Sequence, residues 1–156
     1  MIINVLWIDD ELPTTMQYVL EAMRLLGTYE IEAAISINEC LDRLKEHARS
    51  RTSPDIIILD VIFTISEEER PLANRFMPSE RSELGQANRV GLLLMSQITA
   101  YLPGVPVLVL TNHSAASAVG NEVLSKLRDN PQVKDILQKP RSAGDLDHLI
   151  QEILQK

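Results

Sequence analysis

Short apolar runs alternate with amphipathic helical patterns along the whole chain, and this alternation constrains the fold more than any other feature. The runs predict strands over 3–8, 29–35, 55–60, 105–110 and 133–138. Most are brief and nearly continuous in hydrophobicity, as in strands that are buried on both faces. The run 29–35 instead alternates apolar and charged residues, which is typical of an edge strand. We therefore expect an α/β fold: a doubly wound, five-stranded parallel sheet with helices on both faces.

Length and composition narrow the class of protein further. The chain has 156 residues, which suits one domain over 1–156. Acidic residues outnumber basic ones 22 to 15, which argues against a general nucleic-acid-binding face. No apolar run reaches the roughly 18 residues of a membrane span, and the N-terminus has no basic region of a signal peptide. We expect a cytoplasmic domain that contacts neither nucleic acid nor membrane.

One connection is unusually long. Residues 64–89 separate the third predicted strand from a helical pattern over 90–102, whereas loops in such units usually have about two to six residues. The segment contains Glu67, Glu68 and Glu69, two prolines, and little periodicity. Two interpretations stay open: a solvated loop without a role, or an element that docks a partner or covers a site.

Polar side chains follow four of the predicted strands: Asp9 and Asp10, Asp60, Thr111 and Lys139. Ligands of open parallel sheets bind beyond the carboxyl ends of the strands. Three carboxylates at one edge would raise one another's pKa unless a cation lies among them. Oxygen ligands with room for water suit Mg²⁺ rather than zinc. A carboxylate can also be a nucleophile toward phosphorus, assisted by a metal, a lysine and a hydroxyl group.

The residues Asp9-Asp10, Asp60, Thr111 and Lys139-Pro140, in this order at strand ends, resemble the receiver domain of two-component response regulators. This CheY-like resemblance spans residues 4–154 and implies the strand order 2-1-3-4-5. It implies a stand-alone receiver with an insertion over 64–89. Such a domain accepts a phosphoryl group from a histidine kinase or phosphotransfer protein, and its output is binding to a downstream protein.

The resemblance also implies a role for each matching carboxylate. Asp60 would be the phosphoacceptor. The Mg²⁺ ligands would be Asp9, Asp10, Asp60 and the backbone carbonyl of Ile62. The domain would catalyse its own phosphorylation and dephosphorylation, without being an enzyme that has an external product.

Further residues would contact the phosphoryl group or tune its lifetime. Lys139 would pair with the phosphoryl oxygens, and Thr111 would hydrogen-bond the group and report its presence. Ile62 and His113 stand two residues after Asp60 and Thr111, where the family tunes the access of water. The bond between Lys139 and Pro140 would be cis.

Two features depart from the family pattern. The family has a glycine about eight residues after its phosphoacceptor, whereas the matching Gly91 follows Asp60 by 31 positions. The family often has Tyr or Phe three residues before its lysine, where this chain has Ile136. Isoleucine cannot expose and bury a ring, so we expect any signal to pass through loop movement instead.

Two alternatives from other classes remain. A phosphatase of the haloacid dehalogenase type also forms an aspartyl phosphate, but its signature resembles Asp-x-Asp on the first strand. Here Asp9 and Asp10 are adjacent, and the candidate nucleophile follows the third strand. The other alternative is a phosphorylation-independent interaction module of the receiver fold that docks through residues 64–89.

Overall fold

Five parallel strands form one sheet in the computed structural model, which describes residues 1–80, 82–112, 118–139 and 142–155. The strands are β1 (Ile3–Ile8), β2 (Tyr29–Ala34), β3 (Ile56–Leu59), β4 (Val107–Thr111) and β5 (Val133–Gln138). Their spatial order is β2-β1-β3-β4-β5, and every neighbouring pair is parallel. The expected fold class and strand order are confirmed.

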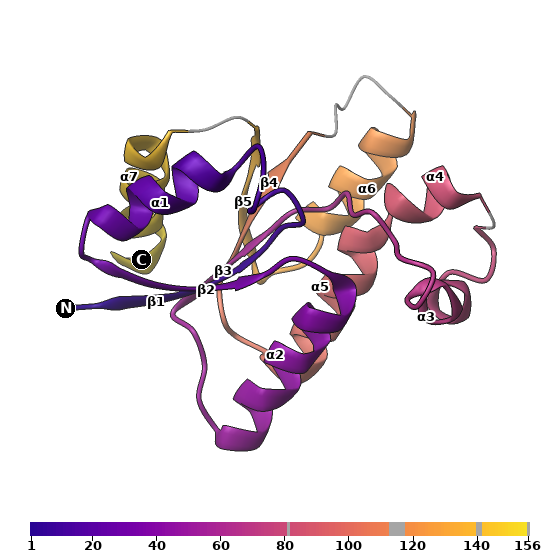
Figure 1. Cartoon of the computed structure of the whole chain (residues 1–156), viewed down its shortest axis with the longest axis horizontal. Helices are drawn as coiled ribbons and strands as arrows, with labels where there is room; N and C mark the ends of the chain where they lie inside the picture. Colours follow the sequence, from indigo (N-terminus) through magenta and orange to yellow (C-terminus); the bar gives the residue numbers. More distant parts are fainter. Residues whose placement is uncertain (81, 113–117, 140–141, 156) are drawn as a thin grey trace.

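Helices cover both faces of this sheet (Figure 1). The helices α1 (Gln17–Leu25) and α7 (Ala143–Gln155) pack on one face. On the other face lie α2 (Ile37–Ser50), α5 (Val90–Tyr101) and α6 (Ala118–Arg128). The two layers produce two separate hydrophobic clusters, one on each face of the sheet.

The strand β1 illustrates why the central runs are almost continuously apolar. Its side chains alternate between the two clusters, with Val5 and Trp7 on the α1 and α7 side. Leu6 and Ile8 point to the opposite side, toward α2 and α5. Both faces of β1 are therefore buried, so no polar alternation survives in its sequence. The edge strand β2 is only half-buried over Ile31 to Ala33, as its alternating pattern predicts.

The long connection contains two short helices, α3 (Arg70–Phe76) and α4 (Glu83–Ala87). Glu69, Ala73 and Gln86 are buried, so the interpretation of this segment as a solvated loop is wrong. Helices of 7 and 5 residues are too short to show a helical period in the sequence. The segment 64–89, which we call the insertion, is thus a folded element that packs against the domain.

The two ends of the insertion lie side by side. The Phe63 N–H donates to the Ala87 carbonyl at 3.1 Å, and the Gly91 N–H donates to the Val61 carbonyl at 2.9 Å. A Cβ atom on Gly91 would lie 2.4 Å from the Val61 Cα. Only glycine therefore lets α5 begin this close to the chain that leaves β3. Because its two ends meet, the insertion leaves the chain after β3 and returns to it directly before α5.

A buried carboxylate anchors the insertion to the start of α2. Glu69 accepts the N–H of Asn38 at 2.8 Å and also binds Ser66. Asn38 is in the first turn of α2, where N–H groups have no partner within the helix. Ser36 caps the same helix, because its hydroxyl oxygen accepts the Glu39 N–H at 3.1 Å.

Replacing Glu69 with alanine should destabilise the protein by about 1–3 kcal/mol, because the part-buried hydrogen bonds that its carboxylate accepts from the Asn38 and Ser66 N–H groups would be lost. Urea unfolding with a circular dichroism readout measures this change. The matched control is Glu68→Ala, since Glu68 is an exposed neighbour in the same acidic run. Equal stabilities for the two variants would contradict the anchoring role.

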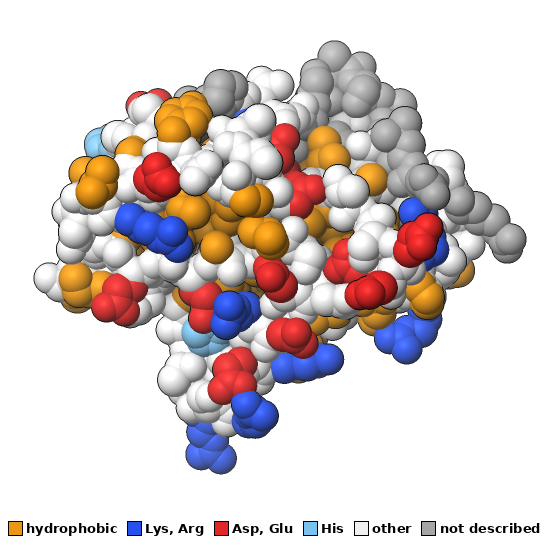
Figure 2. All heavy atoms as spheres, viewed as in Figure 1, with side chains coloured by type: hydrophobic (Ala, Val, Ile, Leu, Met, Phe, Trp, Pro, Cys, Tyr) orange, Lys and Arg blue, Asp and Glu red, His pale blue; other side chains and the backbone are white. Residues whose placement is uncertain are grey.

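Acidic and basic side chains are interspersed on the face shown in Figure 2, with apolar side chains exposed between them. The negative charge of this face is therefore spread out rather than gathered in one patch. Among the described residues, no helix combines the length and the apolar character needed to cross a membrane.

Candidate functional site

Buried charges converge where β1, β3 and β5 end. Asp9 follows β1, Asp60 follows β3 and Lys139 follows β5. The Lys139 Nζ lies 2.7 Å from the Asp9 Oδ2 and 3.1 Å from the Asp60 Oδ2. Both aspartate side chains are almost fully buried, at 0% and 4% exposure. The parallel sheet thus brings together three of the residues that the sequence predicts.

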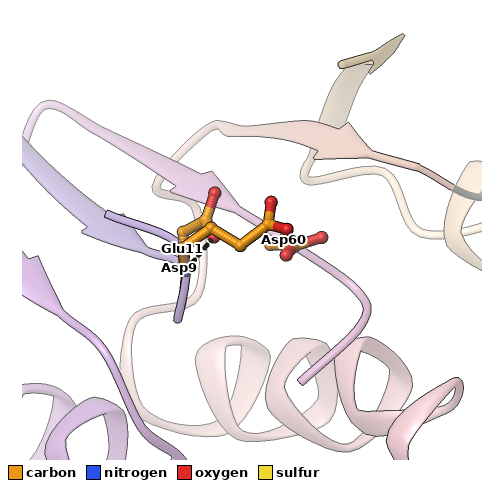
Figure 3. A group of neighbouring side chains, drawn as sticks. All are labelled: Asp9, Glu11 and Asp60. Atoms are coloured by element: carbon orange, nitrogen blue, oxygen red, sulfur yellow. Dashed lines mark hydrogen bonds between the residues drawn. The ribbon is translucent and has the colours of Figure 1, made fainter. Parts of the chain in front are cut away.

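A third carboxylate, which sequence reasoning missed, completes the cluster. The Glu11 Oε2 lies 2.8 Å from the Lys139 Nζ, and Figure 3 shows Glu11 beside Asp9 and Asp60. The Glu11 N–H donates to the Asp9 Oδ1 at 2.9 Å, and this tight turn folds Glu11 back over the strand end. The only sequence signal for Glu11 is its place directly after the aspartate pair.

Asp10 does not lie where its expected role as a direct metal ligand would place it. Its Oδ2 accepts the N–H of Thr64, the first residue of the insertion, at 2.9 Å. Among the described residues, the acids with ligand oxygens within 4.8 Å of one another are Asp9, Glu11 and Asp60. The ligand role of Asp10 stays a prediction, and it would require this carboxylate to turn toward the cluster.

Backbone N–H groups orient the Asp60 carboxylate. The Asp60 Oδ1 accepts the N–H of Val61 at 2.7 Å and that of Ile62 at 3.3 Å. These bonds leave the Oδ2 directed at Lys139. The Ile62 backbone therefore lies at the site, while the metal-ligand role of its carbonyl and the effect of its side chain on water stay predictions.

The last strands supply the remaining predicted residues. Thr111 is buried at the end of β4, and its carbonyl accepts the Lys139 N–H at 2.9 Å. Ile136 is half-buried against the α6 side of the core. His113 and Pro140 lie outside the described residues, so the modulating role of His113 and the cis bond stay predictions.

Burial governs the electrostatics of the cluster. Burial first, and then the charge of Asp9, raise the pKa of Asp60, Lys139 opposes both effects, and the resulting pKa is about 7. Burial likewise raises the pKa of Asp9. Burial disfavours the Lys139 ammonium, but Asp60 and Asp9 outweigh it and raise the pKa of Lys139 above its ordinary value.

The donor set fits a hard divalent cation. Three ionised carboxylates around one ammonium leave an excess of two negative charges. All three offer oxygen, which Mg²⁺ prefers, and the candidate ligand atoms are close enough to share one ion. After burial, the negative charge of Asp9 is the next cause of the raised pKa of Asp60, which reflects the same excess of carboxylates.

The metal-free protein should lose stability as the pH rises from about 4 to about 7. The ordinary pKa of Asp60 is 3.8 and its value in the fold is about 7, so between these values the folded state holds a proton that the unfolded chain has released. This difference corresponds to a few kcal/mol, at about 1.4 kcal/mol for each pKa unit. Urea unfolding in EDTA at pH 5 and pH 8 measures the larger part of this difference, and Asp60→Asn should show a weaker fall. Parallel pH profiles for the two proteins would contradict the raised pKa.

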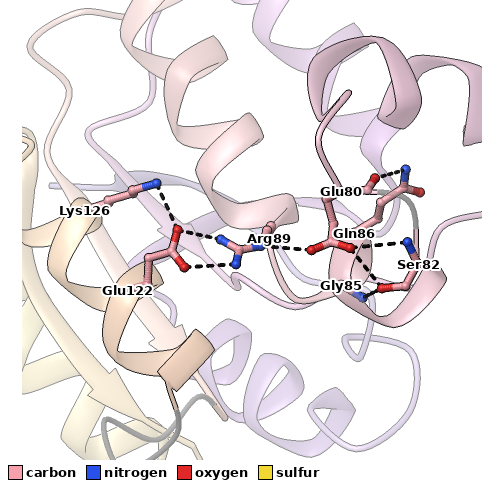
Figure 4. A network of polar contacts seen from close by, with 7 residues as sticks. All are labelled: Glu80, Ser82, Gly85, Gln86, Arg89, Glu122 and Lys126. Carbon is pink, nitrogen blue, oxygen red and sulfur yellow. Dashed lines mark hydrogen bonds and ion pairs between the residues drawn. The ribbon is translucent and has the colours of Figure 1, made fainter.

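A charged network ties the insertion to α6 (Figure 4). Arg89 donates to both carboxylate oxygens of Glu122 at 2.9 Å, and Glu80 lies 3.6 Å from the Arg89 Nε. Hydrogen bonding by Arg89 and then Lys126 lowers the pKa of Glu122 to about 2. The insertion thus contacts α2 through Glu69 and α6 through Arg89.

No family model matches the sequence, and no curated protein matches it. Solved structures do match. A two-component response regulator from Cytophaga hutchinsonii is 18% identical, with all of both chains covered and a TM-score of 0.65. The receiver domain of a sensor histidine kinase from Pseudomonas aeruginosa is 20% identical, with all of both chains covered and a TM-score of 0.63. That structure has a magnesium ion coordinated in its active-site cleft.

A CheY-like receiver domain from Methanospirillum hungatei also matches this chain in structure. It is 15% identical, with 99% of this chain and 95% of that chain covered and a TM-score of 0.63. At sequence identities of 15–20%, these matches show the fold alone. The chain has the CheY-like receiver fold along its whole length.

Proposed function

We propose that this chain is a receiver that accepts a phosphoryl group on Asp60 in a two-component phosphorelay. The observation that carries the proposal is the buried meeting of Asp9, Asp60 and Lys139 at the carboxyl ends of β1, β3 and β5. A structural ion pair would need only one acid for one base. The surplus of buried acid at the ligand-binding edge of the sheet favours a functional site.

The reaction would transfer one group. An Asp60 carboxylate oxygen attacks phosphorus and forms a P–O bond, while the bond from phosphorus to the donor atom breaks and the leaving group takes its electron pair. Lys139, 3.1 Å from the Asp60 Oδ2, is close enough to donate to the phosphoryl oxygens. The backbone N–H of Val61 holds the other carboxylate oxygen, which fixes the direction of attack.

Magnesium would be the cofactor, held by Asp9 and Asp60 together with Asp10, Glu11 or the Ile62 carbonyl. When bound, the ion supplies positive charge that offsets the excess of carboxylates and the charge of the phosphoryl oxygens. The donor set supports this assignment, as does the magnesium ion coordinated in the related receiver domain.

The phosphodonor would be a histidine kinase or a phosphotransfer protein in the cytoplasm. The output would be binding to a downstream protein, and the chemistry would have no external product. Ile136 cannot act as a ring that swings, so we assign the transmission of the signal to loop movement at the site edge.

A second candidate function is phosphorylation-independent docking through the insertion. Two observations favour docking. The insertion is folded, and its helix α3 presents an exposed Phe76 with the Arg75 guanidinium 5.1 Å from the ring centre. Replacing both side chains with alanine separates the two functions. Loss of partner binding with unchanged phosphorylation would favour docking.

The proposal is tested by incubating the protein with Mg²⁺ and acetyl phosphate and recording its intact mass. We expect the mass of one phosphoryl group to be added, to be lost in alkali, and to be absent when EDTA replaces Mg²⁺. An unchanged mass with Mg²⁺ present, on folded wild type and on folded Glu11→Gln alike, would overturn the proposal.

A further inference from the structure

Lys139 is surrounded by as many acids as it has N–H groups. An ammonium has three donors, and carboxylate oxygens of Asp9, Glu11 and Asp60 lie 2.7, 2.8 and 3.1 Å from the Lys139 Nζ. Lys139 donates hydrogen bonds to Glu11 and Asp60 and forms an ion pair with Asp9, so a phosphoryl oxygen that binds Lys139 competes with these acids for the ammonium. Asp9 and Asp60 are held by burial and by the backbone, which leaves Glu11 as the acid free to move.

Glu11 differs from the other two acids in its exposure. Its side chain is 35% exposed, against 0% for Asp9 and 4% for Asp60. It stands in the turn after β1 rather than in a strand, so rotation of its side chain disturbs no strand pairing. Glu11 is thus the member of the cluster that faces the solvent.

A small cavity lies at this position. Its volume is about 170 Å³, and it is lined by Glu11, Thr15, Met16, Asn112 and Lys139. Glu11 and Lys139 both line it, so an anion that approached Lys139 through this cavity would pass the Glu11 carboxylate. The charge of Glu11 would repel that anion, and its bond to Lys139 would compete with it.

We propose that Glu11 is a specificity-determining residue that disfavours small anionic phosphodonors at this site. The inference rests on the proposed function and deepens it by naming the class of donor that is excluded. Repulsion at the cavity and competition for Lys139 act in the same direction. A protein donor can displace the exposed Glu11 side chain through its own contacts, which acetyl phosphate is too small to make.

The test compares wild type with Glu11→Gln, which keeps the size of the side chain and removes its charge. We expect phosphorylation by acetyl phosphate at saturating Mg²⁺ to be about tenfold faster in the variant. The gain should shrink in high salt, because salt screens exposed charges, whereas a change in packing would not respond to salt. A Mg²⁺ titration of each protein ensures saturation.

The matched control is Glu30→Gln, which removes the same charge from an exposed position near the amino end of β2, away from the site edge. It should phosphorylate like wild type. An adduct on wild type with no acceleration in Glu11→Gln, or with equal acceleration in Glu30→Gln, overturns the role of Glu11. No adduct on any of the three proteins overturns the proposed function and this inference with it.

Discussion

Asp60→Asn should abolish phosphorylation completely. Under conditions that add one phosphoryl group to the wild type, the variant should keep its unmodified mass at every donor concentration. The asparagine side chain has nearly the same shape, so it can still accept the N–H of Val61. Its amide oxygen carries no negative charge, however, and is a poor nucleophile toward phosphorus. The measurement is intact-protein mass spectrometry over a time course with Mg²⁺ and acetyl phosphate.

Asp55→Asn is the control for this loss. Asp55 is exposed directly before β3 and accepts the Asn4 N–H at 2.8 Å, so it lies at the opposite end of the strand that positions Asp60. This variant should be phosphorylated like the wild type. If Asp60→Asn still formed the adduct, another residue would be the phosphoacceptor, and the account would be contradicted.

Lys139→Met should cost the metal-free protein about 3–5 kcal/mol of unfolding free energy at pH 8, because removing one partner leaves buried carboxylates without their cation. The acids left behind are Asp9 and Asp60, both almost fully buried, and the half-exposed Glu11. Mg²⁺ should restore part of the loss, because the ion would supply the missing positive charge. Urea unfolding with EDTA or with Mg²⁺ measures both effects.

Lys134→Met is the matched control, since Lys134 is exposed on the same strand and its ammonium donates to the Pro131 carbonyl. Its unfolding free energy should stay within about 0.5 kcal/mol of the wild-type value. If the metal-free Lys139→Met protein were as stable as Lys134→Met, the cluster would not carry the ionised carboxylates that the site requires.

The periodic pattern was sufficient to predict the architecture, because strands buried on both faces leave a nearly continuous apolar signal. It also predicted that Asp9, Asp60 and Lys139 meet, since parallel strands present their carboxyl ends at one edge. The pattern could not indicate which of the adjacent acids Asp10 and Glu11 turns inward. That choice depends on the turn in which the Glu11 N–H binds Asp9 and on the contact between Asp10 and Thr64.

The folded structure of the insertion could not be predicted from the sequence for a related reason. Glu67, Glu68 and Glu69 form a uniform acidic run in the sequence. A tertiary contact with the first turn of α2 selects Glu69 for burial. The helices α3 and α4 are stabilised by such contacts rather than by their own periodicity, because isolated helices of this length are not stable in water.

The central claim, that Asp60 receives the phosphoryl group, is tested most directly by locating the modification. After reaction with Mg²⁺ and acetyl phosphate, borohydride reduces an aspartyl phosphate to homoserine, and peptide mass spectrometry identifies the altered position. We predict homoserine at position 60 and unmodified aspartate at position 55 of the same peptide. Homoserine at any other aspartate, with Asp60 unchanged, would contradict the account.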